Sequence, residues 1–579
     1  MKAGSIMDGK VLPLDVVPLD EQPHAVDCDP AGPAAPLEPV VFERGERFSR
    51  SVLWKLQRAY FDRVGVDAWR TGQVPHYITS NPFVAASYAR VVLGYLRDLA
   101  AAGARVPGEP LTLVELGAGS GRFTYHFLQK LLAEPRSPLL EGVPVRYVMT
   151  DVAPQNLAFW RAHPQLQPFF DAGVLDLALF DAERDDTLRL ERAGTTLSPG
   201  APASALVVIA NYVFDSLPQD AYLLRDGVLH ESRVSLSAPG PLPPLPPLPP
   251  LPLGEGLDDP TLLERLSVSF EHVAMAGDAE PDLDPDFRFL LDEYQGALGD
   301  GALQLPTAAL SCVRALSRLA GGRLLLLSAD KGYCREEDLL YRTDPEIIKH
   351  GSISLMVNYH AVGRYIEHLG GRALFPPQRP TSLCVGAFLL GAPAGGAETA
   401  AAFADAVSGF GPDEWFVMKR GIEAARGKMH LTHLLAALRL SGPDGKVLMD
   451  VFDRLLVLAP EASAEERRSA FALSRRVWEM HYHLGEERDL AFHLGVWMRE
   501  LGYLAEAIGL FERSLSLYGS TPATAYNLAY CHFGQQRGAE ALRWIETALA
   551  GAPDLPGGRA LRTEIRGVLR DEGELPAAS

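Results

Sequence analysis

The chain has 579 residues, 47% of them hydrophobic, and a formal net charge of −19. This length exceeds what one hydrophobic core usually supports and predicts about three or four domains. An acidic chain disfavours nucleic acid as a partner, because binding to phosphates requires basic side chains. The five cysteines are scattered without a Cys-x-x-Cys pair, which is typical of a reducing cytoplasm and predicts no metal site. No secretory signal or run of about twenty apolar residues is visible, so we expect a cytoplasmic protein without a membrane partner.

A glycine-rich turn joins a strand expected over residues 111–116 to a helix expected over residues 123–132. Small residues allow a sharp turn and leave room for a ligand beside the backbone: Gly117, Ala118, Gly119 and Gly121. The Gly-x-Gly-x-Gly spacing, with no lysine after it, differs from dinucleotide and phosphate-loop motifs. It is typical of the first motif of class I S-adenosylmethionine-dependent methyltransferases, and Glu115 in the strand is expected to orient bound groups. A tight turn without a ligand is the alternative.

Acidic residues end the next two predicted strands. The strand over residues 143–150 leads into Asp151, where an acid can accept the ribose hydroxyls of a nucleoside. Asp151 could also cap the helix that starts near Pro154, and the two roles are compatible. The strand over residues 174–180 leads into Asp181, which we expect near the adenine amino group. A solvated acidic loop is the alternative for Asp181.

The fourth predicted strand, residues 205–210, delivers Asn211-Tyr-Val-Phe-Asp-Ser-Leu-Pro218 to the carboxyl edge of the sheet. Methyl transfer mainly requires alignment of acceptor and donor and removal of a proton. Asn211 is therefore a candidate acceptor for an N–H nucleophile, and Asp215 is a candidate charge partner for a guanidinium or amine. A helix cap is the alternative for Asp215. His360 is a candidate base, with a satisfied core histidine as its alternative.

Residues 211–218 resemble the MidA-like family of class I methyltransferases, whose corresponding segment reads Asn-Glu-Phe-Phe-Asp-Ala-Leu-Pro. Tyr212 replaces the family's glutamate. His76-Tyr-Ile-Thr-Ser-Asn-Pro82, with Asn81 inserted, is similar to the family's Phe-x-Thr-Ser-Pro-Glu. This match implies that Thr79 and Ser80 contribute to the donor site.

Two later segments match the same family in the same order. They are Asp330-Lys331-Gly332-Tyr333, which follows a strand expected over residues 323–328, and the segment at residues 351–361. The resemblance covers about residues 50–392. It implies S-adenosyl-L-methionine as cofactor and methylation of a protein, notably at arginine side chains.

A Pro-Pro-Leu repeat at residues 239–253 predicts polyproline II structure. It could be a ligand for an SH3-like partner or an exposed spacer within an insertion. Asp226-Gly227 predicts a hairpin turn before it, and β-like alternation resumes over residues 262–275.

Beyond residue 392 the pattern becomes helical and ends in a repeat with a 34-residue offset. Leu494 recurs as Leu528, Ala507 as Ala541 and Phe511 as Ile545. This period resembles tetratricopeptide repeats, which bind extended peptides in a groove. Structural support is the competing use. Aromatic and histidine side chains could line a groove or pack: His481, Tyr482, His483, Trp497, Tyr526 and His532.

These patterns predict a disordered tail over residues 1–50 and a Rossmann-like α/β methyltransferase domain over residues 51–392. A helical linker over residues 393–485 and an α-solenoid of tetratricopeptide-like repeats over residues 486–575 follow. We expect methylation of a protein or peptide nitrogen, arginine first, with the repeats recruiting the polypeptide. A small-molecule N- or O-methyltransferase and a non-catalytic assembly protein with a vestigial nucleotide site are the alternatives.

Overall fold

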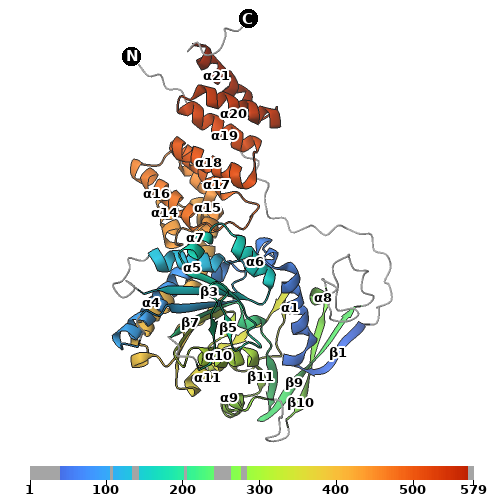
Figure 1. Ribbon diagram of the computed structural model, residues 1–579. Helices are drawn as coiled ribbons and strands as arrows, with labels where there is room; N and C mark the ends of the chain where they lie inside the picture. The colour runs from blue at the N-terminus through green and yellow to red at the C-terminus, as the bar shows by residue number, and fades with distance from the viewer. Residues whose placement is uncertain are drawn as a thin grey trace, which may run out of the picture.

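The computed structural model describes residues 39–104, 108–133, 143–200, 205–239, 262–275 and 283–571. A seven-stranded sheet lies between two layers of helices, and a helical region extends beyond it (Figure 1). The strands lie in the order β17 (Arg372–Leu374), β18 (Cys384–Leu390), β12 (Leu324–Asp330), β7 (Leu206–Asn211), β2 (Leu111–Leu116), β3 (Val145–Asp151) and β4 (Leu175–Leu179).

Five of these strands, from β4 to β12, run parallel, whereas β18 is antiparallel to both of its neighbours. Every residue of β2, β12 and β18 is buried, as expected for strands that are covered on both faces. The strand order reverses at β2, which has β3 on one side and β7 on the other. Open α/β sheets bind ligands at such a switch point, outside the carboxyl ends of the strands.

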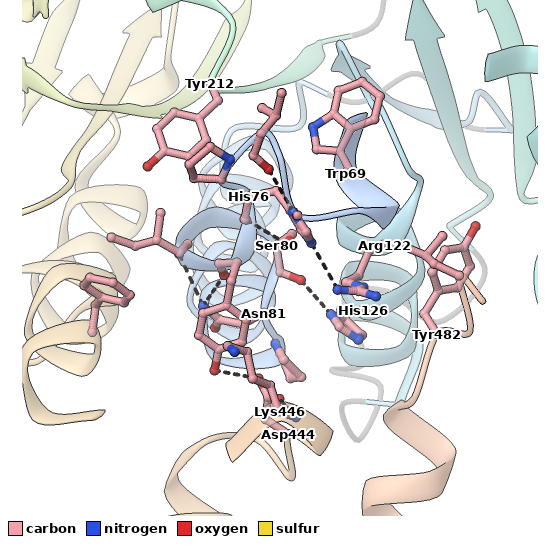
Figure 2. Close-up of a pocket in the computed structure, with 18 of the residues that line it drawn as sticks. Trp69, His76, Ser80, Asn81, Arg122, His126, Tyr212, Asp444, Lys446 and Tyr482 are labelled. Carbon is pink, nitrogen blue, oxygen red and sulfur yellow. Dashed lines mark hydrogen bonds between the residues drawn. The ribbon is translucent and has the colours of Figure 1, made fainter. Parts of the chain in front are cut away.

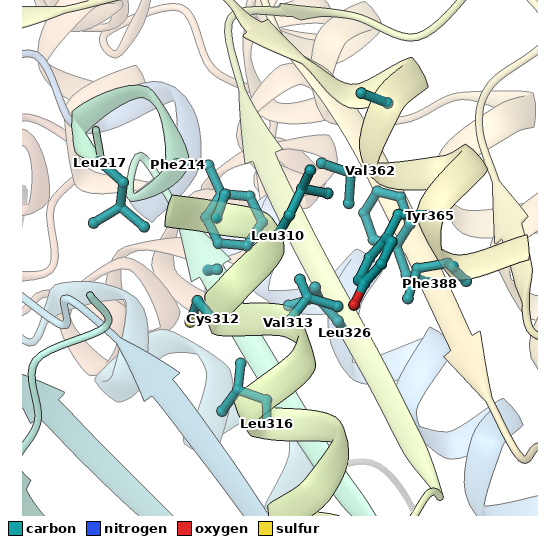
Figure 3. Packing of buried hydrophobic residues seen from close by; sticks show 14 of the residues in the cluster. Phe214, Leu217, Leu310, Cys312, Val313, Leu316, Leu326, Val362, Tyr365 and Phe388 are labelled. Carbon is teal, nitrogen blue, oxygen red and sulfur yellow. The ribbon is translucent and has the colours of Figure 1, made fainter. Parts of the chain in front are cut away.

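Each face of the sheet is covered by its own helices and its own hydrophobic core. One face packs against α4 (Pro82–Ala101), α5 (Arg122–Ala133), α6 (Pro154–Ala162) and α7 (Gln167–Asp171). The other packs against α9 (Pro285–Ala297), α10 (Thr307–Leu319) and α11 (Tyr359–His368). Figure 3 shows Leu310, Val313 and Leu316 of α10 close to Leu326 of β12 and Tyr365 of α11.

A second sheet flanks this core and is antiparallel. Its strands are β1 (Pro39–Arg47), β9 (Val228–Pro239), β8 (Asp220–Arg225) and β11 (Gly301–Leu305), with β10 (Ser267–Ala274) beside β9. The expected hairpin turn is present, because Asp226 and Gly227 have φ angles of 51° and 73° between β8 and β9. The Pro-Pro-Leu repeat lies outside the described residues except for Pro239.

The expectation of a disordered tail over residues 1–50 is wrong for residues 39–50. β1 pairs with β9, and Arg47 forms a buried ion pair of 2.7 Å with Asp220. The strand was missed because its charged residues obscure the alternation of apolar and polar positions.

Further elements lie before, between and after the strands of the two sheets. They are η1 (Phe48–Arg50), α1 (Val52–Val64), α2 (Asp67–Arg70), α3 (Tyr77–Ser80), β5 (Leu188–Arg189), β6 (Thr196–Leu197), η2 (Phe214–Ser216), α8 (Leu262–Arg265), β13 (Gly332–Tyr333), η3 (Glu336–Leu339), β14 (Ile348–His350), β15 (Ser352–Ser354) and β16 (Val357–Asn358).

The remainder of the chain is helical. Its elements are η4 (Pro393–Gly395), α12 (Ala397–Phe403), η5 (Ala404–Gly409), α13 (Pro412–Ala425), η6 (Arg426–Lys428), α14 (Leu431–Leu440), α15 (Gly445–Leu458), α16 (Ala464–Met480), α17 (Leu490–Glu500), α18 (Leu504–Tyr518), α19 (Pro522–Gly534), α20 (Gly538–Gly551) and α21 (Gly558–Asp571). Within the described ranges, none of the helices is both long and apolar enough to span a membrane.

The segment expected as a linker is packed rather than extended. α12 lies against α4, where a Cβ on Gly94 would come within 2.8 Å of Ala402 Cβ. One hydrophobic core runs from Trp415 in α13 to Leu528 in α19, across the predicted boundary at residue 485. Trp497 is fully buried in this core, so it packs instead of lining a groove.

A segment between α16 and α17 joins the helical region to the sheet, and we call residues 480–488 the strap. The ring of Tyr482 is buried and stacks on His163 at a centroid distance of 4.1 Å. Gln165 donates to the His481 carbonyl at 2.5 Å and accepts from the His483 backbone N–H at 2.8 Å. The strap therefore fixes the helical region against the ends of α5 and α6.

Candidate functional site

The glycine turn has the backbone that its sequence predicts. Gly117, Gly119 and Gly121 have φ angles of 58°, 53° and 78°, which side chains rarely tolerate. A Cβ on Gly117 would lie 3.2 Å from Val213, and one on Gly119 would lie 3.0 Å from the Trp69 indole. The turn therefore requires glycine both for its conformation and for its close contacts. Ala118 is buried, and its N–H donates to the Thr150 carbonyl at 2.9 Å.

Trp69 covers the exposed side of this turn. Its indole belongs to α2, which lies between two glycines with positive φ, Gly65 at 55° and Gly72 at 74°. The same indole stacks on Phe61 at a centroid distance of 5.8 Å. A side chain of the protein thus lies over Gly119, and a ligand that contacts the turn has to displace or stack on Trp69.

Asp151 lies beside the turn, as expected from its place at the end of β3. It accepts from the Gly119 N–H at 3.3 Å, the Ala153 N–H at 3.0 Å and Asn156 Nδ2 at 2.9 Å. Burial raises the pKa of this carboxyl group. The N-cap of α6 is Ala153, so the alternative of Asp151 as the cap residue is wrong. Its carboxylate organises the turn and the start of α6 together.

Glu115 points into the protein instead of toward the turn surface. Its carboxylate accepts from Tyr147 at 2.8 Å and from Thr124, which ties β2 to β3 and α5. Burial raises the pKa of Glu115 to about 7, against the effect of these two hydrogen bonds. In this structure Glu115 therefore holds β2, β3 and α5 together, and its role in orienting a bound ligand stays a prediction.

Asp181 is held by another part of the chain. It forms an ion pair of 2.7 Å with Arg58 of α1 and accepts from the Glu183 N–H at 3.0 Å. It is not among the residues that line the cavity described below. The structure gives Asp181 a role in holding α1 against the end of β4.

Thr79 and Ser80 lie in α3, and both hydroxyls donate to the His76 carbonyl, at 3.3 Å and 2.8 Å. Of these two, Ser80 lines the cavity. His76 also contacts Arg122, whose Nη1 lies 3.1 Å from Nε2. Burial and Arg122 lower the pKa of His76 to about 4.

The structure brings Asn211 and Asp215 together after β7. Asn211 Oδ1 accepts from Tyr88 at 2.9 Å, and its buried Nδ2 has no partner. Asp215 is buried within η2 and accepts from Ser216 at 2.9 Å. The helix-cap alternative for Asp215 is wrong, because η2 begins at Phe214 and no side chain caps it.

Asp330 completes this group and was not predicted as a site residue. It ends β12 beside β7, is fully buried, and leaves Oδ1 without a partner while Tyr359 donates to Oδ2 at 3.2 Å. Burial raises the pKa of Asp215 to about 7, and burial together with Asp215 raises the pKa of Asp330 further. We call Asn211, Asp215 and Asp330 the acid cluster. Acids that end neighbouring parallel strands meet at one edge, and this rule was the available signal for Asp330.

Tyr212 links the acid cluster to the cavity. Its φ angle of 53° is strained for an aromatic residue, and its N–H donates to the Ala329 carbonyl at 3.0 Å. The side chain lines the cavity next to Lys331. Tyr212 thus combines a strained backbone with an aromatic side chain in the cavity wall.

His360 is not part of the acid cluster. Its Nδ1 lies 2.9 Å from the Tyr294 hydroxyl of α9. The preceding Tyr359 faces inward and lies 2.7 Å from Ser328 Oγ. Because consecutive helical residues point about 100° apart, His360 faces away from the cluster. The structure therefore does not bring His360 together with Asn211 and Asp215, and its role as a base stays a prediction.

A cavity of about 1150 Å³ opens between the sheet and the helical region. Figure 2 shows Trp69 and Tyr212 at one end of it and Asp444 and Lys446 of the helical region at the other. Arg122 and Tyr482 form the side nearest the strap. The helical region thus supplies one wall of the cavity.

Comparisons with known proteins were made by sequence and by structure. No family model matches the chain, and no curated protein matches it. A COG1565 superfamily member from Burkholderia thailandensis bound to S-adenosyl-homocysteine is similar in structure, with 15% identity, a TM-score of 0.37, and 69% of this chain and 83% of that chain covered. A native structure of an uncharacterized COG1565 superfamily protein from the same organism has 14% identity, a TM-score of 0.36 and coverages of 69% and 83%.

The raised pKa of Glu115 predicts a measurable pH dependence of stability. The pKa of the folded carboxyl is about 7 against an ordinary value of 4.5 for glutamate, so the folded state binds more protons between these values. Stability should therefore fall as pH rises through this window, by roughly 3 kcal/mol for this group alone. Glu115→Gln should lose that slope in urea melts at pH 4.5 to 7.5. The exposed control Glu512→Gln should follow the wild type, and parallel curves for all three proteins would contradict the assignment.

Proposed function

We propose that this chain is an S-adenosylmethionine-dependent methyltransferase whose donor binds at the glycine turn. The observation that carries the proposal is a turn of three positive-φ glycines at the sheet's switch point, with Asp151 hydrogen-bonded to its middle glycine. A bare backbone lets a nucleoside and its amino acid part approach closely, and a carboxylate at the end of the next strand can accept ribose hydroxyls.

Trp69 has a defined part in this proposal. Its indole covers Gly119, and α2 can change position through the two positive-φ glycines that flank it. An aromatic ring in contact with the turn can also stack on an adenine. Donor binding should therefore move Trp69 away from Gly119 or place its ring on the base.

The acid cluster fits the acceptor side of the reaction. When bound, S-adenosylmethionine supplies an electrophilic methyl group on a sulfonium. The chain has to hold the acceptor nitrogen in line and take the proton that this nitrogen loses. Asp215, with a pKa of about 7, can hold that proton near neutral pH. Since Tyr88 donates to Asn211 Oδ1, the free Nδ2 is a donor here, and the expected role of Asn211 as a carbonyl acceptor changes accordingly.

A protein or peptide nitrogen, arginine first, is the acceptor that we propose. The cavity is slightly larger than the roughly 300–1,000 Å³ of small-molecule sites, and the helical region forms one of its walls. Once Asp215 has lost its proton, its carboxylate favours a cationic guanidinium, which forms paired hydrogen bonds with a carboxylate. A small-molecule acceptor is the competing use of this cavity.

A scaffold without activity is the second candidate, and one observation favours it. Trp69 lies over the turn, and Asp151 already accepts three hydrogen bonds. In a vestigial site these contacts would be permanent and the donor would not bind. Measurement of donor binding therefore distinguishes the methyltransferase from the scaffold.

Helices α17 to α20 support a recruiting role for the helical region. The recurring residues Ala507, Phe511, Ala541 and Ile545 are all fully buried between neighbouring helices. A Cβ on Gly495 would lie 2.6 Å from Phe511, so α17 and α18 approach closely. We propose that these helices form tetratricopeptide-like pairs that hold a polypeptide near the cavity.

Donor binding can be tested with two matched aspartates. Asp151→Ala should weaken binding of S-adenosylhomocysteine by about 10- to 100-fold, because a ribose hydroxyl loses its acceptor. Asp176→Ala is the control. Asp176 lies within β4, is also buried, and accepts hydrogen bonds from three backbone N–H groups. Calorimetry should give wild-type affinity for that control. Equal affinities in all three proteins, or no binding by the wild type, would contradict the donor site.

The proposed role of Asp215 in the acid cluster predicts that its substitution lowers turnover. Asp215→Asn should lower kcat by roughly 10- to 100-fold on a peptide acceptor and leave donor affinity unchanged. Because the pKa of Asp215 is about 7, wild-type turnover should rise with pH through that value and the variant should lack this rise. Asp338→Asn, a buried aspartate paired with Arg379 away from the cavity, is the control. Wild-type kcat and pH profile in Asp215→Asn would exclude this role.

If the helical region recruits the acceptor, donor binding and acceptor recruitment should be separable by truncation. Truncation after Gly534 removes α20 and α21 but keeps the strap and α17 to α19, which share their cores with the rest of the protein. The truncated protein should bind S-adenosylhomocysteine normally and show a raised KM for a polypeptide acceptor, with kcat preserved. Loss of donor binding would mean that these helices serve packing, and an unchanged KM would exclude recruitment.

A further inference from the structure

The strap carries a group of side chains that neither the proposed donor site nor the acid cluster uses. His481, His483 and Glu486 each direct one nitrogen or oxygen atom to a common point, and these atoms lie within 4.8 Å of one another. His481 and Glu486 also line the cavity. We propose that these three residues bind a late first-row divalent cation, Zn²⁺, at the junction between the sheet and the helical region.

The donor set suits this cation. Two imidazoles and one carboxylate are a common zinc set, and three protein ligands leave a fourth position for water or another oxygen. Two buried polar atoms at this place make no hydrogen bond, His483 Nδ1 and the Tyr518 hydroxyl, although His483 Nδ1 lies within ion-pair distance of Glu486. The Tyr518 ring packs edge-on against His483 at 5.5 Å between centroids. A bound cation would provide the missing partner for His483 Nδ1.

The backbone that carries the ligands is fixed by side chains of the α/β domain. Gln165 binds the His481 carbonyl and the His483 N–H, and His163 Nε2 lies 2.8 Å from the His483 carbonyl. The Leu484 N–H donates to Glu486 Oε2 at 2.9 Å. The residues are therefore held near one another before any ion arrives, which reduces the entropic cost of binding.

The positive charge of Arg122 disfavours a cation at this place. The proposal therefore predicts in which direction removal of that charge changes the affinity for the metal. Its guanidinium pairs with Glu486 Oε1, while Glu486 Oε2 lies 3.5 Å from His483 Nδ1. A cation at the three ligands would repel the guanidinium and compete with it for the carboxylate. Removal of the Arg122 charge should consequently tighten metal binding, whereas removal of a ligand should weaken it.

The test uses the full-length protein after treatment with a chelator. Calorimetric titration with Zn²⁺ should show one equivalent bound, and Co²⁺ should give the visible absorption of a four-coordinate site. His481→Gln and His483→Gln should each weaken Zn²⁺ binding by on the order of 100-fold. The exposed control His368→Gln should bind as the wild type does. Arg122→Gln should bind more tightly than the wild type.

These experiments measure metal binding and do not require methyl transfer. Their results therefore test the metal site independently of the proposed function. Absence of stoichiometric Zn²⁺ binding would overturn the proposal, and so would equal affinity in the wild type and both histidine variants. If a histidine variant fails to fold, Arg122→Gln decides: tighter binding supports the site, and unchanged or weaker binding refutes it.

Discussion

The parallel register of β3, β2, β7 and β12 is the constraint on which the site depends. Because these strands run the same way, their carboxyl ends meet at one edge of the sheet. The glycine turn, Asp151, the acid cluster and Tyr212 all come directly after these strands. A change of direction in any one strand would move its residues to the opposite edge. The sheet thus collects at one place functional groups that are far apart in the sequence.

The strap places a second structural unit over that edge. Tyr482 stacks on His163, and its buried hydroxyl would lie 3.0 Å from a Cβ on Gly121. The packing around the glycine turn therefore includes a residue from the helical region. The same region forms a wall of the cavity, which both parts of the chain line, whereas the turn glycines, Asp151 and the acid cluster are not among the lining residues. The helical region from residue 393 onward is therefore packed against the α/β domain and is not a separate domain on a linker.

Local signals in the sequence were sufficient for the five parallel strands of the main sheet, the glycine turn and the place of Asp151, because each strand is a short apolar run and the turn and Asp151 follow such runs. Asp330 was missed because its relation to Asp215 exists only across neighbouring strands. Trp69 and Tyr482 reach the turn from distant segments, and no spacing in the sequence predicts such contacts. His360 lies apart from the acid cluster because the preceding Tyr359 takes the inward face of α11, a difference that the sequence pattern does not show. Glu115 has the expected position but binds Thr124 and Tyr147, a choice that depends on side chains of two other elements.

The central claim is that the glycine turn is a donor site that Trp69 covers in the absence of ligand. A crystal structure of the full-length protein with S-adenosylhomocysteine tests it most directly. The account predicts ribose oxygens within hydrogen-bond distance of Asp151, and a Trp69 indole that has left Gly119 or stacks on the adenine. Ligand bound elsewhere in the cavity, with Trp69 still against Gly119, would contradict it.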